Sequence, residues 1–160
     1  MMRRLGIAVL CTMMFSISSW SQESVSLLVN KSAKLGDSNI TFTFMNLIDK
    51  IPATNQFMQP DTGKKLVKLT LRVDASNSEI GITPSSESFE IKDGDGFSYK
   101  ENMTSHTYNK TPFSDRGIDA GDFGSGTIVI EVPEDLDVKS LRIRWAGNQT
   151  AFWSPWVKVQ

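Results

Sequence analysis

The sequence predicts an all-β fold, an immunoglobulin-like sandwich of seven to eight antiparallel strands. Three observations support this prediction. Short segments alternate apolar with polar residues, turn-forming Gly, Pro, Asp and Ser residues separate these segments, and no stretch after the N-terminal segment shows a helical period. A chain of 160 residues is expected to form one domain, and it is long enough to bury a core without disulfides.

Residues 1–21 are predicted to be a signal peptide, which leaves a single sandwich domain over residues 22–160. A pair of arginines precedes an apolar run that is too short to span a bilayer, and a serine-rich stretch follows up to Ser21. The protein is therefore expected to be secreted or periplasmic, without a membrane span after cleavage. The only cysteine, Cys11, lies in this segment, so the mature domain is expected to hold no disulfide and no thiol nucleophile.

Three strands are expected in the first half of the domain, because apolar side chains recur there at every second position. Their ranges are Gln22–Asn30, Asn39–Asn46 and Lys65–Ala75. The side chains expected to face inward are Val25, Leu27, Val29, Ile40, Phe42, Phe44, Val67, Leu69, Leu71 and Val73. Between the second and third strands, two prolines and Gly63 predict a long loop over Asp49–Gly63.

The second half is expected to contain shorter strands and a long loop. The strands are expected at residues 89–91, 97–99, 127–132, 139–145 and 157–159. An Asp-Gly-Asp-Gly turn at residues 93–96 joins the first two into a hairpin, with Phe97 and Tyr99 facing inward. Residues 100–125 are expected to form an irregular loop, and the last strand is expected at a sheet edge.

Two motifs in this order are similar to those of a known family. One is a strand followed by Asp95-Gly96-Phe97, and the other is a glycine before a strand that ends in Val-Pro, at Gly126–Pro133. The chain resembles the telokin-like, immunoglobulin-fold domain of bacterial secreted proteins and lipoproteins known as DUF4352. The resemblance covers about Ser24 to Trp145 and leaves Asp49–Gly63 and the C-terminal tail without a counterpart. It implies a secreted or surface-attached β-sandwich and supplies no catalytic residues.

Asp93 and Asp95 are the candidate metal ligands. Two carboxylates spaced by one glycine, with open backbone carbonyls, suit a hard, oxygen-binding cation such as calcium. The alternative is that these residues only form a hairpin turn. The spacing is not that of an EF-hand, since Thr104 stands where that loop carries its last glutamate. Apart from this candidate calcium site, no cofactor is expected.

Aromatic and sulfur-containing side chains in the loops and tail are the candidate interaction residues. They are Phe57, Met58, Phe113, Phe123, Trp153 and Trp156. Exposed Trp side chains, with Pro155 between them, would suit stacking on sugars or contact with a partner protein. The alternative is that these residues close one end of the sandwich or anchor loops on the core, since Trp is usually largely buried.

No catalytic set supports an enzyme. The sequence has one histidine, His106, no cysteine after the N-terminal segment and no Gly-x-Ser-x-Gly motif. A net charge of -1 gives no reason to expect a nucleic-acid partner. The expected function is an exported, non-catalytic binding or protein-interaction module that contacts an unknown protein or surface ligand through its loops. The alternatives are a structural or accessory envelope protein, whose edge strand pairs with a partner, and a calcium-dependent binding protein.

Overall fold

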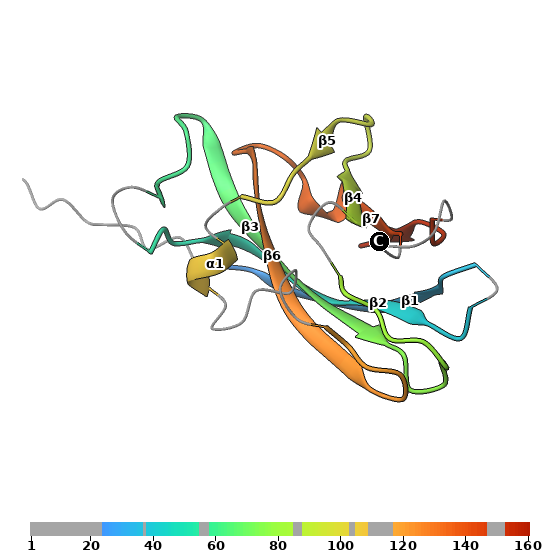
Figure 1. Cartoon of the computed structure of the whole chain (residues 1–160). Helices are drawn as coiled ribbons and strands as arrows, with labels where there is room; N and C mark the ends of the chain where they lie inside the picture. Colours follow the sequence, from blue (N-terminus) through green and yellow to red (C-terminus); the bar gives the residue numbers. More distant parts are fainter. Residues whose placement is uncertain are drawn as a thin grey trace, which may run out of the picture.

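The computed structural model describes residues 24–36, 38–54, 58–84, 88–102, 105–108, 117–146 and 153–160. Within them, two antiparallel sheets of four strands face each other and enclose the main hydrophobic core (Figure 1). This arrangement confirms the predicted all-β, immunoglobulin-like sandwich. The predicted signal peptide lies outside the described residues. In the described part of the chain, no helix has the length and apolar character needed to cross a membrane.

The first sheet contains the long strands, in the order β1-β2-β3-β6. Their bounds are β1 Ser26–Lys34, β2 Thr41–Ile51, β3 Lys64–Asp74 and β6 Phe123–Pro133. β3 shows the alternation that predicted it, with four inward-facing residues that are each 0% exposed: Val67, Leu69, Leu71 and Val73. Burial of each such side chain stabilises the fold by about 1.5–3 kcal/mol.

The second sheet contains the short strands, in the order β5-β4-β7-β8. Their bounds are β4 Phe89–Lys92, β5 Ser98–Tyr99, β7 Arg142–Trp145 and β8 Val157–Lys158. A 3-10 turn, η4 Val138–Ser140, precedes β7, so the strand predicted over residues 139–145 begins only at Arg142. β8 lies at the sheet edge, as predicted. A single helical turn, α1 Ser105–Tyr108, lies beside β6 (Figure 1).

Three aromatic side chains join the two sheets across the core. Trp145 of β7 is fully buried, and its ring stacks on Phe89 of β4 with the centroids 6.2 Å apart. Phe89 in turn contacts Phe42 of β2 with the centroids 5.8 Å apart. Because Phe42 belongs to the first sheet, this row of rings connects the two sheets through the core and buries large apolar surfaces.

Two strands of the first sheet extend further than predicted. β1 continues through Lys34 and β2 through Ile51, so the loop predicted over Asp49–Gly63 is shorter than expected. The pairing of each strand contains a register shift. Near these shifts, Asn30 of β1 has a φ of 46° and Lys50 of β2 has a φ of 55°. A bulge moves the side-chain alternation by one residue, so the continuation no longer fits a period of two.

β6 begins at Phe123, within the predicted long loop, rather than at Thr127. Its first residues, Phe-Gly-Ser-Gly, lack the apolar alternation of a strand, yet they pair in register with β3. A Cβ atom at Gly124 would lie 2.8 Å from Cδ1 of Ile118, so glycine allows Ile118 to pack closely against the strand.

Two apolar side chains that were predicted to face inward are exposed instead. Val25 is 56% exposed and lies just before the first residue of β1, where the strand alternation does not yet apply. Phe97 is 69% exposed, because its backbone closes the β4–β5 turn and directs the side chain outward. This exposed ring lies at the rim of a hollow.

Candidate functional site

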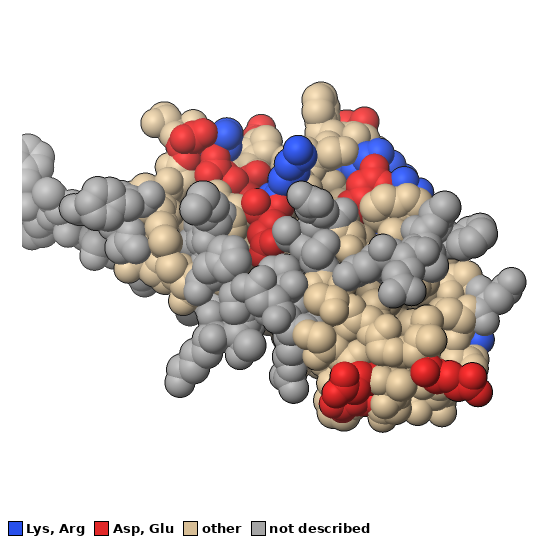
Figure 2. Space-filling view, viewed as in Figure 1, with Lys and Arg blue, Asp and Glu red and all other residues tan. Residues whose placement is uncertain are grey.

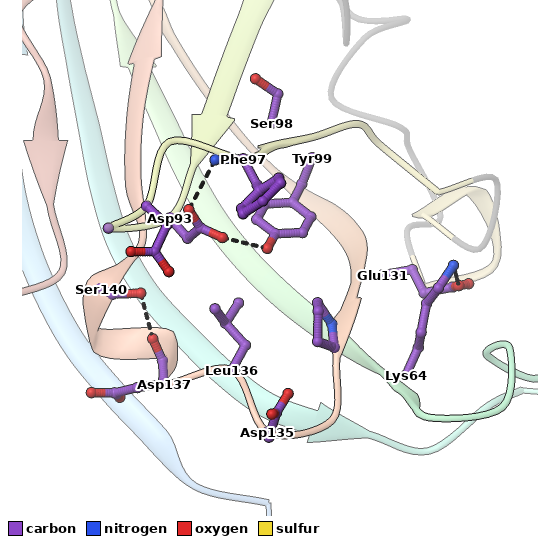
Figure 3. Close-up of a pocket in the computed structure, with 13 residues that line it drawn as sticks. Lys64, Asp93, Phe97, Ser98, Tyr99, Glu131, Asp135, Leu136, Asp137 and Ser140 are labelled. Carbon is purple, nitrogen blue, oxygen red and sulfur yellow. Dashed lines mark hydrogen bonds and ion pairs between the residues drawn. The ribbon is translucent and has the colours of Figure 1, made fainter.

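An open hollow of about 750 Å³ lies at one end of the sandwich, between the β4–β5 turn and the chain that connects β6 to β7 (Figure 3). Two aromatic side chains, Phe97 and Tyr99, line it from the side of the turn. Its carboxylate-bearing residues are Asp93, Asp95, Glu131, Asp135 and Asp137. The hollow therefore combines aromatic surface with negative charge.

The carboxylate of Asp93 holds the β4–β5 turn together and is 3% exposed. Its Oδ1 accepts the backbone N–H of Phe97 at 3.0 Å, and its Oδ2 accepts the hydroxyl of Tyr99 at 2.6 Å (Figure 3). Gly96 completes the turn with a φ of 92°, which glycine adopts without steric cost. The predicted Asp-Gly turn is present, and its first aspartate serves the turn itself.

The same hydrogen bonds keep Asp93 ionised. Burial by itself would raise the pKa of Asp93, but the Tyr99 hydroxyl and the backbone N–H groups of the turn outweigh burial and lower this pKa. Burial raises the pKa of Tyr99, and the neighbouring Asp93 carboxylate raises it further. The pair therefore stays as carboxylate and neutral phenol across the physiological pH range.

Lys64 is the cationic residue of the hollow, and carboxylates already neutralise it. Its Nζ lies 2.8 Å from Asp61 Oδ2 and 2.9 Å from Glu131 Oε1. The hydrogen bond to Asp61, followed by that to Glu131, raises the pKa of Lys64. Lys64 therefore does not offset the carboxylates on the opposite side of the hollow.

The wall formed by residues 134–140 is held in place by polar contacts. The buried Nζ of Lys65 donates to the carbonyl of Leu136 at 3.0 Å and pairs with Asp49 Oδ1 at 3.1 Å. At the start of η4, Asp137 Oδ1 accepts the N–H of Lys139 at 3.0 Å. These bonds attach the connection to β2 and β3, so the hollow has a fixed wall.

Three carboxylate side chains of the hollow have no cationic partner among the described residues. In the described part of the chain, Asp95, Asp135 and Asp137 form no ion pair with lysine, arginine or histidine. All three side chains are exposed. On the face shown in Figure 2, acidic and basic side chains lie near one another along the upper edge, and further acidic side chains lie along the lower edge. The hollow therefore presents a negative surface to solvent.

The candidate metal ligands, Asp93 and Asp95, lie on the same turn at this hollow. Both carboxylate oxygens of Asp93 already accept hydrogen bonds, so calcium binding would have to compete with Phe97 and Tyr99. Among the described residues, no group of three or more His, Cys, Asp and Glu side chains is placed to hold a metal ion. The calcium site stays a prediction.

The candidate interaction residues lie on several parts of the molecule. Phe57 and Phe113 lie outside the described residues. Met58 is partly exposed in the β2–β3 loop. Phe123 is 47% exposed at the start of β6, and the guanidinium of Arg72 lies 3.8 Å above its ring centroid.

Trp153 and Trp156 come together on the outer face of the second sheet. The Cζ of Arg144 lies 4.6 Å from the ring centroid of each. Trp156 also lies over Arg142, at 4.9 Å, and over Lys92, at 5.8 Å. The two rings therefore cover the outside of the sheet rather than closing one end of the sandwich.

Sequence reasoning missed two features of the site. The hydrogen bond between Tyr99 and Asp93 has no sequence signal beyond their place on one hairpin. The acidic wall did have a signal, because residues 131–137 read Glu-Val-Pro-Glu-Asp-Leu-Asp. Taken alone, Pro133 in this run predicts only that a strand ends there.

Two solved structures share the fold. A conserved hypothetical protein from Bacillus anthracis is 11% identical, with a TM-score of 0.58 over 86% of this chain and 99% of its own. The yjhA protein from Bacillus subtilis is 10% identical, with a TM-score of 0.59 over 82% of this chain and 98% of its own. At these identities the likeness concerns the fold alone. No curated protein matches the chain.

A family profile described as Domain of unknown function (DUF4352) matches residues 27–150. The match includes both motifs that carry the resemblance, the Asp95-Gly96-Phe97 turn and the strand that ends in Val132-Pro133. Because the profile covers most of the chain, this protein belongs to the DUF4352 family.

Proposed function

We propose that this chain is an exported, non-catalytic binding module and that the hollow beside the β4–β5 turn is its binding site. One observation carries the proposal: the side chain of Phe97 is 69% exposed and lines the same hollow as carboxylates that have no cationic partner among the described residues. A concave site that combines apolar surface with a few polar groups is the common form of a ligand site. The N-terminal sequence pattern supports export.

The direction of the pKa shifts favours binding over catalysis. At the hollow, the pKa of Asp93 is lowered, whereas those of Tyr99 and Lys64 are raised. All three shifts lead away from neutrality. A general acid or base works best with a pKa near the working pH. These groups are therefore suited to holding a ligand rather than to transferring protons.

The proposed ligand carries a cationic group beside an apolar one. An ammonium or guanidinium group would be attracted by Asp95 and Asp135, and an adjacent apolar group would pack on the Phe97 ring. A lysine- or arginine-rich segment of a partner protein has both groups. The proposed ligand class is therefore a basic segment of a partner protein.

Fluorescence anisotropy with a labelled peptide of alternating Lys and Phe tests this proposal. The combined variant Asp95→Asn with Asp135→Asn is expected to raise the Kd by about tenfold, because each exposed ion pair contributes up to about 1 kcal/mol. Phe97→Ala is expected to raise it as well. The matched control, Glu79→Gln with Asp119→Asn, removes two exposed carboxylates elsewhere and should leave the Kd unchanged.

Two results would refute the basic-ligand proposal. One is equal binding of a peptide of alternating Glu and Phe, and the other is an equal loss of affinity in the control variant.

A calcium site is tested separately by thermal unfolding with calcium chloride and with EDTA. A Tm that calcium raises in the parent protein but not in Asp95→Asn would assign the hollow to calcium instead.

The alternative of a structural or accessory envelope protein is supported by β1. This strand of nine residues lies at the edge of the first sheet, and Leu28 is 83% exposed. Exposed strand edges can pair with a strand of another chain. Sedimentation velocity tests this alternative, since concentration-dependent association that Leu28→Asp abolishes would favour it.

A further inference from the structure

Cationic side chains gather on the outer face of the second sheet. The strand register places Lys92 of β4, Arg142 of β7 and Lys158 of β8 side by side across three strands. Arg144 lies on the same face of β7, opposite Glu90 of β4. On these strands the outer face thus carries a surplus of positive charge, in a protein with a net charge of -1.

Carboxylates of the described residues do not balance this row of cations. Glu90 pairs with Arg144 and with Lys92, whose Nζ lies 2.6 Å away. Among the described residues, Arg142 and Lys158 have no carboxylate partner. Like charges on directly opposed strand positions destabilise a sheet. In addition, Nε of Arg142 is buried and has no hydrogen-bond acceptor in the part of the chain that the structure describes, and a buried donor without an acceptor is costly in a folded protein.

The tryptophan rings explain only part of this arrangement. Trp153 and Trp156 flank the guanidinium of Arg144, and Trp156 also covers Arg142. Such cation–π contacts stabilise the C-terminal segment on the sheet. They do not include Lys158, which is exposed at the end of the row. Trp153 also remains 39% exposed, so aromatic surface lies next to unmatched positive charge.

We propose that this face binds an anionic polysaccharide, a polymer with carboxylate groups on its sugar rings. The C–H faces of sugar rings can pack on the exposed Trp153 ring, while carboxylates pair with Lys158 and Arg142. A neutral glycan would leave the cations unmatched. An acidic peptide would use the cations without using the flat ring. This site is independent of the hollow and of the ligand proposed there.

Binding assays on the whole protein with three polymers test the proposal. Polygalacturonate carries charge and sugar rings, dextran carries rings without charge, and poly-L-glutamate carries charge without rings. Polygalacturonate is expected to bind at least about tenfold more tightly than the other two, and its affinity should fall as salt screens the charges. No binding of polygalacturonate would overturn the proposal. Equal binding of poly-L-glutamate would replace the glycan with an acidic protein partner and would also overturn it.

Substitutions then locate the site. Lys158→Gln is expected to weaken polygalacturonate binding by about threefold to fivefold, in the range of one exposed charge pair. Trp153→Ala should weaken it further, while Trp153→Phe, which keeps an aromatic ring, should restore part of the affinity. The matched control is Lys34→Gln, which removes one exposed lysine from the other sheet. Equal losses of affinity in Lys34→Gln and Lys158→Gln would show that the binding is unspecific charge attraction, and this would overturn the proposal.

Discussion

The two sheets of this sandwich differ in strand length and in what they carry. The first sheet is built from strands of nine to eleven residues, and the second from strands of two to four residues. Both surfaces proposed to bind ligands involve the second sheet: the hollow beside its β4–β5 turn and the cation row on its outer face.

The two proposals divide the molecule, with stability in the first sheet and ligand binding on surfaces of the second. Long strands bury many alternating side chains and form continuous backbone ladders, so they tolerate little change. Short strands end early, and their turns and outward side chains are held by single polar or aromatic contacts, such as the bond between Asp93 and Tyr99. Substitutions in the first sheet should therefore affect stability, whereas substitutions of exposed side chains on the second, such as Phe97 and Lys158, should mainly affect binding.

Leu71→Ala should give the largest effect, because it opens a cavity at a fully buried position in the middle of β3. The free energy of unfolding is expected to fall by about 2–5 kcal/mol. Urea unfolding followed by tryptophan fluorescence measures this change. A smaller loss of unfolding free energy than that caused by Tyr99→Phe would contradict the proposed division of stability and binding between the two sheets.

Gly124→Ala should cost less, about 1–3 kcal/mol, because overpacking forces neighbouring atoms to shift. The new Cβ would lie 2.8 Å from Cδ1 and 2.9 Å from Cγ1 of Ile118, which is itself buried. Thermal unfolding gives the change in Tm. The informative comparison is the double variant with Ile118→Val, since a smaller partner should relieve part of the clash. If Ile118→Val restores none of the lost stability, the cost of Gly124→Ala arises from the backbone rather than from the contact with Ile118.

Much of the architecture follows from side-chain alternation, and the exceptions have identifiable causes. β3 was predicted to within one residue at each end, because nothing interrupts its period of two. The strand predicted for β1 ends at Asn30, which has a positive φ beside a register shift. The strand predicted for β2 ends at Asn46, at the register shift that follows Phe44. The start of β6 is not predictable from alternation, because Gly124 has no side chain to extend the apolar pattern. Its role is to leave room for the side chain of Ile118.

The candidate site was predictable only in pieces. The Asp93–Gly96 turn could be recognised, because Asp-Gly sequences form tight turns locally. Its juxtaposition with Asp135 could not, because that depends on how two distant connections meet at the end of the sandwich. Likewise, alternation placed Arg142 and Arg144 on the outer face, but no local rule indicated that Trp153 and Trp156 would fold back over them.

Tyr99→Phe should reduce stability by about 1–3 kcal/mol at neutral pH, because it removes a hydrogen bond to an ionised carboxylate. The sign of the pH dependence follows from Asp93. Its pKa is lowered in the folded state, so its contribution is present above the unfolded pKa of about 4 and is lost as pH falls through the folded value. The difference between parent and variant should therefore shrink in acid. Urea unfolding at a series of pH values measures it, and a constant difference would show that the hydroxyl acts through packing alone.

Lys158→Gln should have the smallest effect on stability and the opposite sign. Removing one of three aligned cations relieves repulsion with Arg142, so the free energy of unfolding is expected to rise by a few tenths of a kcal/mol, about 0.2–0.5. Urea unfolding at low salt measures the gain, which should disappear at high salt because the repulsion is then screened. Lys34→Gln provides the comparison, since Lys34 lies opposite an uncharged residue, Thr41. A loss of stability in Lys158→Gln would mean that Lys158 supports the fold, and the outer face would then have to be regarded as structural like the first sheet.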